Sequence, residues 1–265
     1  MPMTMARTSL LVTAMLVGHF AVAEGERISF VACPVVRDTA TVPCFLADNA
    51  GTTYYLGIQQ DIGADWFPPQ LNHKVLVEGY LSGDTVCGGL EIKPIATSVL
   101  PTVDPACNTI LPAEPGIVAP HAERGAGPNG EVPGSAPRRA PPPPPEPPFA
   151  VKEFSLSFTF DDDGLIAREF GVLARAIEYA KVSKASAIDI VISRGSAKLS
   201  SGEVINEDPS AVMRRERLIR RWLAVAELPT ATRVSIKPMG EPLPADGRTD
   251  ENNRYIKLTI TPEKR

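Results

Sequence analysis

The spacing of hydrophobic and polar positions in this 265-residue chain has one pattern in the first half and another in the second half. The first half has apolar runs of strand length, separated by turn residues and without helical spacing. The predicted strands cover residues 28–33, 42–47, 53–59, 73–81 and 90–99. An Asp-Asn-Ala-Gly turn at 48–51 separates the second from the third. The pattern therefore predicts an all-β domain, either a small closed barrel or a sandwich.

The second half contains both the alternating pattern of strands and the three-to-four-residue spacing of helices. Strict alternation over 154–160 predicts a half-buried strand, and apolar residues from Ile166 to Ala180 recur at spacings of three and four, which predicts an amphipathic helix. A strand at 188–193, a polar loop at 194–207 and a second helix at 208–227 follow. Asp208 before Pro209 is typical of a helix N-cap followed by proline. Strands at 232–239 and 254–261 complete a β-α-β-α-β-β order, and we expect an α+β sandwich with its helices on one face.

Composition divides the chain further. Twelve of the thirty-seven residues at 113–149 are proline, which indicates a stiff, extended linker. The expected domains are therefore residues 24–112 and 150–265. Residues 1–23 have the three parts of a secretory signal peptide: Arg7, an apolar core at 10–17 and the Ala-Val-Ala sequence at 21–23. The core is too short to span a membrane, and we expect no transmembrane segment in the mature chain.

The four cysteines support export. Their even number in an exported chain indicates two disulfides, which allow three connectivities. The shortest loops predict Cys33–Cys44 and Cys87–Cys107. No C-x2-C unit is present, so we expect no zinc site, and we expect no other metal or cofactor.

Charge excludes one class of partner. The net charge is −4, and residues 24–112 carry four basic and ten acidic side chains. An acidic surface repels phosphate backbones, so we expect no nucleic acid on the first domain. Five arginines crowd into 214–221, but at about 100° per residue most of them form an ordinary solvated helix face.

Arg215 is the exception, because it projects into the middle of the apolar arc of the second helix. A buried guanidinium requires an anionic partner. That partner is either a ligand carboxylate near the helix N-terminus or an internal acid, such as one of the aspartates at 161–163 or Asp189. The position of Arg215 alone does not decide between them. The three aspartates also allow a calcium site, but a solvated turn fits their spacing better.

The second helix resembles that of the OmpA C-terminal-like, peptidoglycan-associated domain family. The family pattern is N-x2-L-S-x2-R-A-x2-V-x3-L, and this chain has the following residues at those positions: Asp208, Ala211, Val212, Arg215, Glu216, Ile219 and Leu223. The arginine and the final leucine are identical, and Glu216 replaces the family's alanine. Asn253-Arg254-Tyr255-Ile256 is similar to the family's last strand, which opens with Asn-Arg-Arg-Val. The resemblance covers about residues 152–262. The first domain is loosely similar to OB-fold barrels through its strand count.

The resemblance implies a ligand and a set of site residues. In that family an arginine holds a carboxylate of diaminopimelate in peptidoglycan stem peptides, and an aspartate holds the ammonium group. It therefore implies a site of Arg215, Asp208, Asn253 and Arg254. The family aspartate lies just after the second strand, where this chain has Arg-Gly-Ser-Ala-Lys at 194–198. The nearest carboxylates are Glu203, Glu207 and Asp208.

Two functions follow as hypotheses. The first is a non-catalytic protein of the periplasm that docks on peptidoglycan through Arg215 and presents its first domain to an unknown envelope protein. Association with the cell wall or the outer membrane is part of that hypothesis. The second is a degenerate domain that serves as a protein–protein interaction module without peptidoglycan binding. An enzyme is not expected, because His73 is the one histidine in a predicted folded domain and no nucleophile or metal motif occurs.

Overall fold

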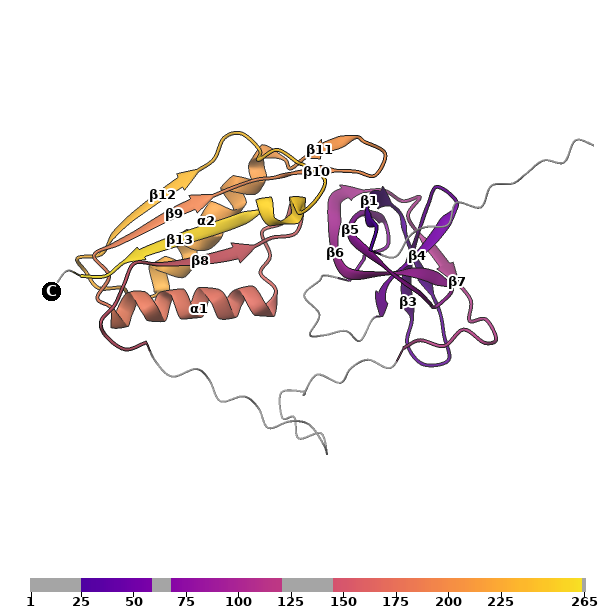
Figure 1. Cartoon of the computed structure of the whole chain (residues 1–265), viewed down its shortest axis with the longest axis horizontal. Helices are drawn as coiled ribbons and strands as arrows, with labels where there is room; N and C mark the ends of the chain where they lie inside the picture. The colour runs from indigo at the N-terminus through magenta and orange to yellow at the C-terminus, as the bar shows by residue number, and fades with distance from the viewer. Residues whose placement is uncertain (1–24, 59–67, 121–144, 264–265) are drawn as a thin grey trace, which may run out of the picture.

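The computed structural model describes residues 25–58, 68–120 and 145–263. The predicted signal peptide and most of the linker lie outside the described residues. Figure 1 shows two lobes, here called the first lobe (25–120) and the second lobe (145–263).

The first lobe is one seven-stranded sheet with the order β1-β5-β6-β4-β3-β2-β7. Its strands are β1 (Arg27–Ala32), β2 (Pro34–Arg37), β3 (Cys44–Asn49), β4 (Thr52–Ile58), β5 (His73–Val86), β6 (Gly89–Val103) and β7 (Thr109–Leu111). The five predicted strands are present, and β2 and β7 were missed because they are only four and three residues long. The two ends of the sheet, β1 and β7, do not pair with each other. The predicted closed, OB-like barrel is therefore wrong.

The long β5–β6 hairpin organises this lobe. Alternate residues of β1, β5 and β6 point inward and form a core of Phe30, Val75, Val77 and Ile92. At Gly79 the two strands approach so closely that a Cβ would collide with Ile92 and with the carbonyl oxygen of Pro94. The pairing shifts register immediately after Gly79, where a small residue lets the ribbon bend.

Two disulfides close the first lobe, Cys33–Cys107 and Cys44–Cys87. The predicted connectivity is therefore wrong. Loop length was a poor guide because the sheet decides which cysteines meet: Cys44 begins β3, and Cys87 lies in the turn between β5 and β6. Disulfides of this kind are typical of proteins that mature in an oxidising, extracytoplasmic compartment.

The second lobe contains a four-stranded sheet with the order β12-β9-β13-β8. Its elements in chain order are β8 (Lys152–Ser157), α1 (Ala167–Val182), β9 (Ala187–Ile192), β10 (Ser196–Lys198), β11 (Val204–Asn206), α2 (Pro209–Val225), β12 (Arg233–Pro238), the 3-10 helix η1 (Asp250–Asn253) and β13 (Tyr255–Thr261). The core lies between the sheet and the two helices and includes Leu156, Leu173, Ile190, Ile219 and Leu258.

The predicted polar loop at 194–207 is instead a two-stranded sheet, β10–β11, in which Ser196 pairs with Asn206. The β-α-β-α-β-β order is thus interrupted between β9 and α2. Across the described residues the chain has thirteen strands in three sheets and only two α-helices. The expected OmpA-like α+β sandwich is therefore wrong as a fold class, and the protein is mostly β.

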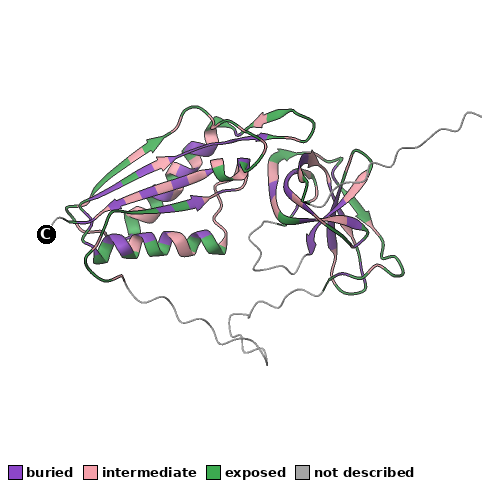
Figure 2. Ribbon diagram, in the orientation of Figure 1, coloured by how far each residue is buried: buried purple, intermediate pink, exposed green. Residues whose placement is uncertain are grey.

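The two lobes pack directly against each other. The β10–β11 turn meets the outer edge of β1, where Ser29 and Ser200 exchange two hydrogen bonds of 2.9 and 2.7 Å. The N–H of Phe160 donates to Ser98 Oγ on β6, and Leu76, Phe160 and Ala197 form a buried cluster across the boundary. The contact residues Ser29, Leu76, Ser98, Phe160 and Ala197 are all buried. Figure 2 shows the ribbon of both lobes coloured by burial. The lobes are therefore not held apart by the proline-rich linker.

Among the described helices, none is long and apolar enough to cross a membrane.

Candidate functional site

Arg215 lies in the second turn of α2, on the side that packs against the sheet. Asp208 caps the helix by accepting a hydrogen bond from the N–H of Ser210, and Pro209 takes the first helical position. The cap fixes the start of the helix and therefore the direction in which Arg215 points. Its side chain is completely buried, in agreement with the helical projection.

All five N–H donors of Arg215 are used inside the protein. Nε donates to the carbonyl of Asp162 at 2.9 Å, and Nη1 donates to the carbonyl of Ser193 at 3.0 Å. Nη2 donates to the carbonyl of Thr159 at 3.2 Å. The two remaining donors go to the two carboxylate oxygens of Glu207 in a bidentate pair.

Glu207 is as buried as its partner, and two further donors hold it. Its oxygens accept the N–H groups of Asp161 at 2.9 Å and Gly195 at 2.7 Å. The guanidinium also lies 4.7 Å above the ring centre of Phe158. The internal acid is therefore Glu207 rather than an aspartate of 161–163 or Asp189, and Asp162 contributes only its carbonyl.

A second buried arginine repeats this arrangement at the boundary between the lobes. Arg254 precedes β13 and pairs with Glu78 of β5, and both side chains are about 1% exposed. Its guanidinium lies 5.5 Å from the ring centre of Phe160, two residues along from Phe158. Burial, as the largest cause, raises the pKa of Glu78, while the charge of Arg254 lowers it in part. Arg254 therefore joins the lobes through Glu78, and its buried Nε has no hydrogen-bond partner among the described residues.

The other predicted site residues have structural contacts too. Asp208 is exposed at the start of α2, and Asn253 donates from Nδ2 to the carbonyl of Pro244 at 3.1 Å. Ser193 links Asn253 to Arg215, because its hydroxyl donates to the Asn253 carbonyl and its own carbonyl accepts from Arg215. The four residues thus belong to one region, but they do not form an open receptor.

Besides Glu78, the sequence patterns missed Asp250 of η1, a further buried acid in this region. Its carboxylate is fully buried and accepts three backbone N–H groups, from Lys198, Asp246 and Gly247, at 2.8 to 3.1 Å. It ties the β10–β11 hairpin to the loop before β13. The one hint in the sequence was its position next to the Asn-Arg segment at 253–254.

Asp161 is the partly exposed acid beside the buried pair. It has a positive φ of 58°, and its Oδ1 accepts the N–H of Asp208. Burial is the main cause that raises its pKa; the Asp208 hydrogen bond opposes the rise, and the charges of Glu207 and Asp208 add to it.

Asp161→Asn is therefore expected to stabilise the protein near neutral pH, by less than ~1 kcal/mol because solvent screens the partly exposed charge. Asparagine keeps the acceptor and tolerates positive φ. The pKa of Asp161 is higher in the folded state than in the unfolded state, so the carboxylate's penalty is present above the folded pKa and disappears on acidification. Thermal unfolding from pH 7 to pH 3 measures this. If the difference in unfolding temperature between Asp161→Asn and the wild type grows at low pH, the raised pKa of Asp161 is wrong. Asp161→Ala should destabilise the protein, because the N–H of Asp208 then loses its acceptor.

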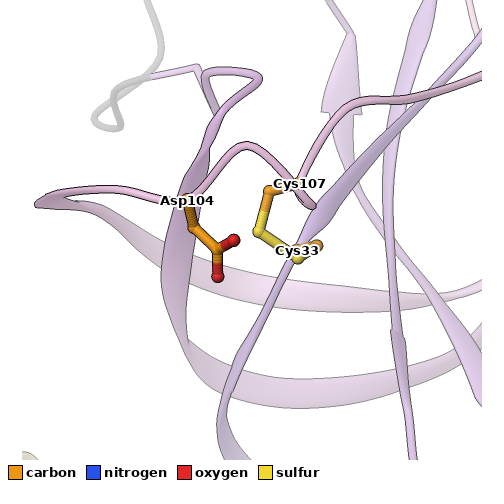
Figure 3. Close-up of side chains that lie close together, drawn as sticks. All are labelled: Cys33, Asp104 and Cys107. Atoms are coloured by element: carbon orange, nitrogen blue, oxygen red, sulfur yellow. A yellow bond between two sulfur atoms is a disulfide. The ribbon is translucent and has the colours of Figure 1, made fainter.

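Three potential metal-ligating side chains, Cys33, Asp104 and Cys107, lie together in the first lobe (Figure 3). The two sulfur atoms are bonded to each other, so neither is a thiolate ligand. Asp104 accepts the N–H of Ala106 at 3.1 Å and pairs with Lys74 at 3.4 Å. This cluster is therefore a turn that the Cys33–Cys107 disulfide stabilises.

Comparison with known proteins gives no relative: no family model matches the chain, and neither a curated protein nor a solved structure matches it.

Proposed function

We propose that this protein is a non-catalytic interaction module of an extracytoplasmic compartment, which binds another protein and does not use Arg215 to hold peptidoglycan. The observation that carries the proposal is the full internal use of the Arg215 donors, two of them by the buried carboxylate of Glu207. A guanidinium in this state has no N–H left for a ligand carboxylate.

The rival function is docking on peptidoglycan stem peptides. It requires the Glu207 carboxylate to move away from Arg215, so that a ligand carboxylate can take its place. Its departure removes the acceptor from the N–H groups of Asp161 and Gly195 as well as from Arg215. Unpaired buried donors are costly, at about 1–3 kcal/mol each. A ligand carboxylate has to replace all of these bonds before it gains anything.

The disulfides and the predicted signal peptide support an extracytoplasmic location, and the periplasm is the compartment that we propose.

A ligand-binding test separates the two functions without any mutation. A ligand that binds the folded state raises the unfolding temperature. We expect free diaminopimelate to leave the unfolding temperature of the mature protein unchanged, and isolated sacculi to sediment no more of it than of an unrelated acidic protein. We also expect chemical crosslinking in envelope extracts to trap a protein partner. Sedimentation that free diaminopimelate competes away overturns the proposal.

A further inference from the structure

The helices of the second lobe leave an apolar groove of about 700 Å³ between α1 and α2. Its floor is made of buried Leu173 and Ala226. Phe170 and Val225 line it and are 43% and 69% exposed, although both are large and apolar. Exposed apolar residues that gather in one concave place mark a contact surface.

An aromatic pair gives the groove a rigid wall. The ring of Trp222 on α2 meets the ring of Phe170 on α1 edge-on, with the ring centres 5.5 Å apart. Ile177 continues the apolar lining along α1. Accessible aromatic side chains, tryptophan above all, are among those that contribute most to protein interfaces.

Charges around the groove are mainly positive. Lys181 lines it together with Glu178, and Arg175 lies along it, since its Nη1 is 3.3 Å from where a Cβ of Gly171 would lie. Arg221 lies one turn before Val225 on α2 and is exposed. None of these three basic side chains has an ion pair among the described residues, whereas Arg214 and Arg220 pair with Asp163 and Glu216.

We infer that this groove binds an amphipathic helix of a partner protein, with apolar residues facing Phe170 and Trp222 and acidic residues facing Arg175, Lys181 and Arg221. The inference rests on the proposed function and names the surface that performs it. The 16 residues of α1 span about 24 Å, which accommodates a partner helix of three to four turns. A second copy of this chain is disfavoured because its basic rim would repel the first, and a membrane is disfavoured because the apolar side chains line a hollow.

The test uses two designed 16-residue peptides with the same leucines at helical spacing. One carries glutamates at the flanking positions, and the other carries lysines. Fluorescence anisotropy of labelled peptides should show that the mature protein binds the glutamate peptide and not the lysine peptide, and that added salt weakens binding. Val225→Glu should weaken it by about tenfold or more.

Met213→Glu is the matched control, because Met213 is on the same helix, is 59% exposed and lies outside the groove. It should bind as the wild type does. The double variant Arg175→Glu/Lys181→Glu should reverse the preference toward the lysine peptide. Circular dichroism and thermal unfolding confirm that each variant is folded, and both substituted faces are solvent-exposed.

Several outcomes overturn the inference. The first is equal binding of the two peptides, and the second is an equal loss of peptide affinity in Val225→Glu and Met213→Glu. The third is a dimer of the wild type that Val225→Glu abolishes, which would make a second copy the partner. The fourth is binding to anionic vesicles that Val225→Glu abolishes, which would make a membrane the partner. Failure of the groove is distinct from failure of the proposed function. If the crosslinked envelope partner is retained by Val225→Glu, the groove is wrong and the function stands. If the wild type captures no partner, the function itself is wrong.

Discussion

Replacement of Arg215 by methionine is expected to lower the free energy of unfolding by about 3–5 kcal/mol, the cost of leaving one member of a buried ion pair alone. The Glu207 carboxyl group would remain completely buried and retain only two backbone N–H donors. The carbonyls of Asp162, Ser193 and Thr159 would lose their donors as well. Urea denaturation followed by circular dichroism measures the change.

Arg217→Met is the control, since Arg217 is exposed on the same helix and a surface substitution costs within about 0.5 kcal/mol. Adding Glu207→Gln to Arg215→Met should recover part of the loss, because the uncompensated charge is gone. If Arg215→Met is no more destabilising than Arg217→Met, the side chain is not buried against Glu207. A loss of binding in an Arg215 variant is therefore informative only when the fold has been checked.

Replacement of Arg254 by methionine should have the second largest effect, with a cost of about 3 kcal/mol near neutral pH. Glu78 is then left buried at the boundary between the lobes, with Arg27 at 3.7 Å as its nearest cation. Calorimetry should show the lobes unfolding less cooperatively than in the wild type. Arg248→Met is the control, because its exposed side chain can be removed while its backbone carbonyl still accepts the hydroxyl of Tyr80.

The loss of stability in Arg254→Met should depend on pH in a defined direction. Burial already raises the pKa of Glu78 in the folded protein, and removal of the Arg254 charge takes away a contribution that lowers it. The penalty is then largest above the folded pKa, where Glu78 is charged, and declines as acidification protonates it. Glu78→Met/Arg254→Met should recover most of the stability at pH 7. A penalty that is constant with pH shows that Glu78 is not the group left unpaired.

The parts of this structure that local patterns determine were predictable. The helical spacing from Ile166 to Ala180 and the Asp208–Pro209 signal located both α-helices, and the projection of α2 placed Arg215 on its buried side. These depend on residues within a few turns of one another.

The rest depends on contacts between distant residues. Glu207 lies in a segment without periodicity, so its burial follows from the β10–β11 hairpin and not from its neighbours in sequence. Glu78 lies 176 residues before Arg254, and no local pattern pairs them. The same reason explains the wrong disulfide connectivity and the wrong closed barrel, since both are set by which strands become neighbours in space.

The direct contact between the lobes changes what the proline-rich segment does physically. Residues 113–149 connect two bodies that already touch, so the segment closes a loop and acts as a tether more than as a spacer. Because the two lobes belong to one chain, their encounter is intramolecular and does not depend on the protein concentration. Each opening of the boundary is therefore followed by intramolecular rebinding, and a chain cut once in this segment should remain a two-fragment complex held by Arg254, Glu78 and the buried cluster around Phe160.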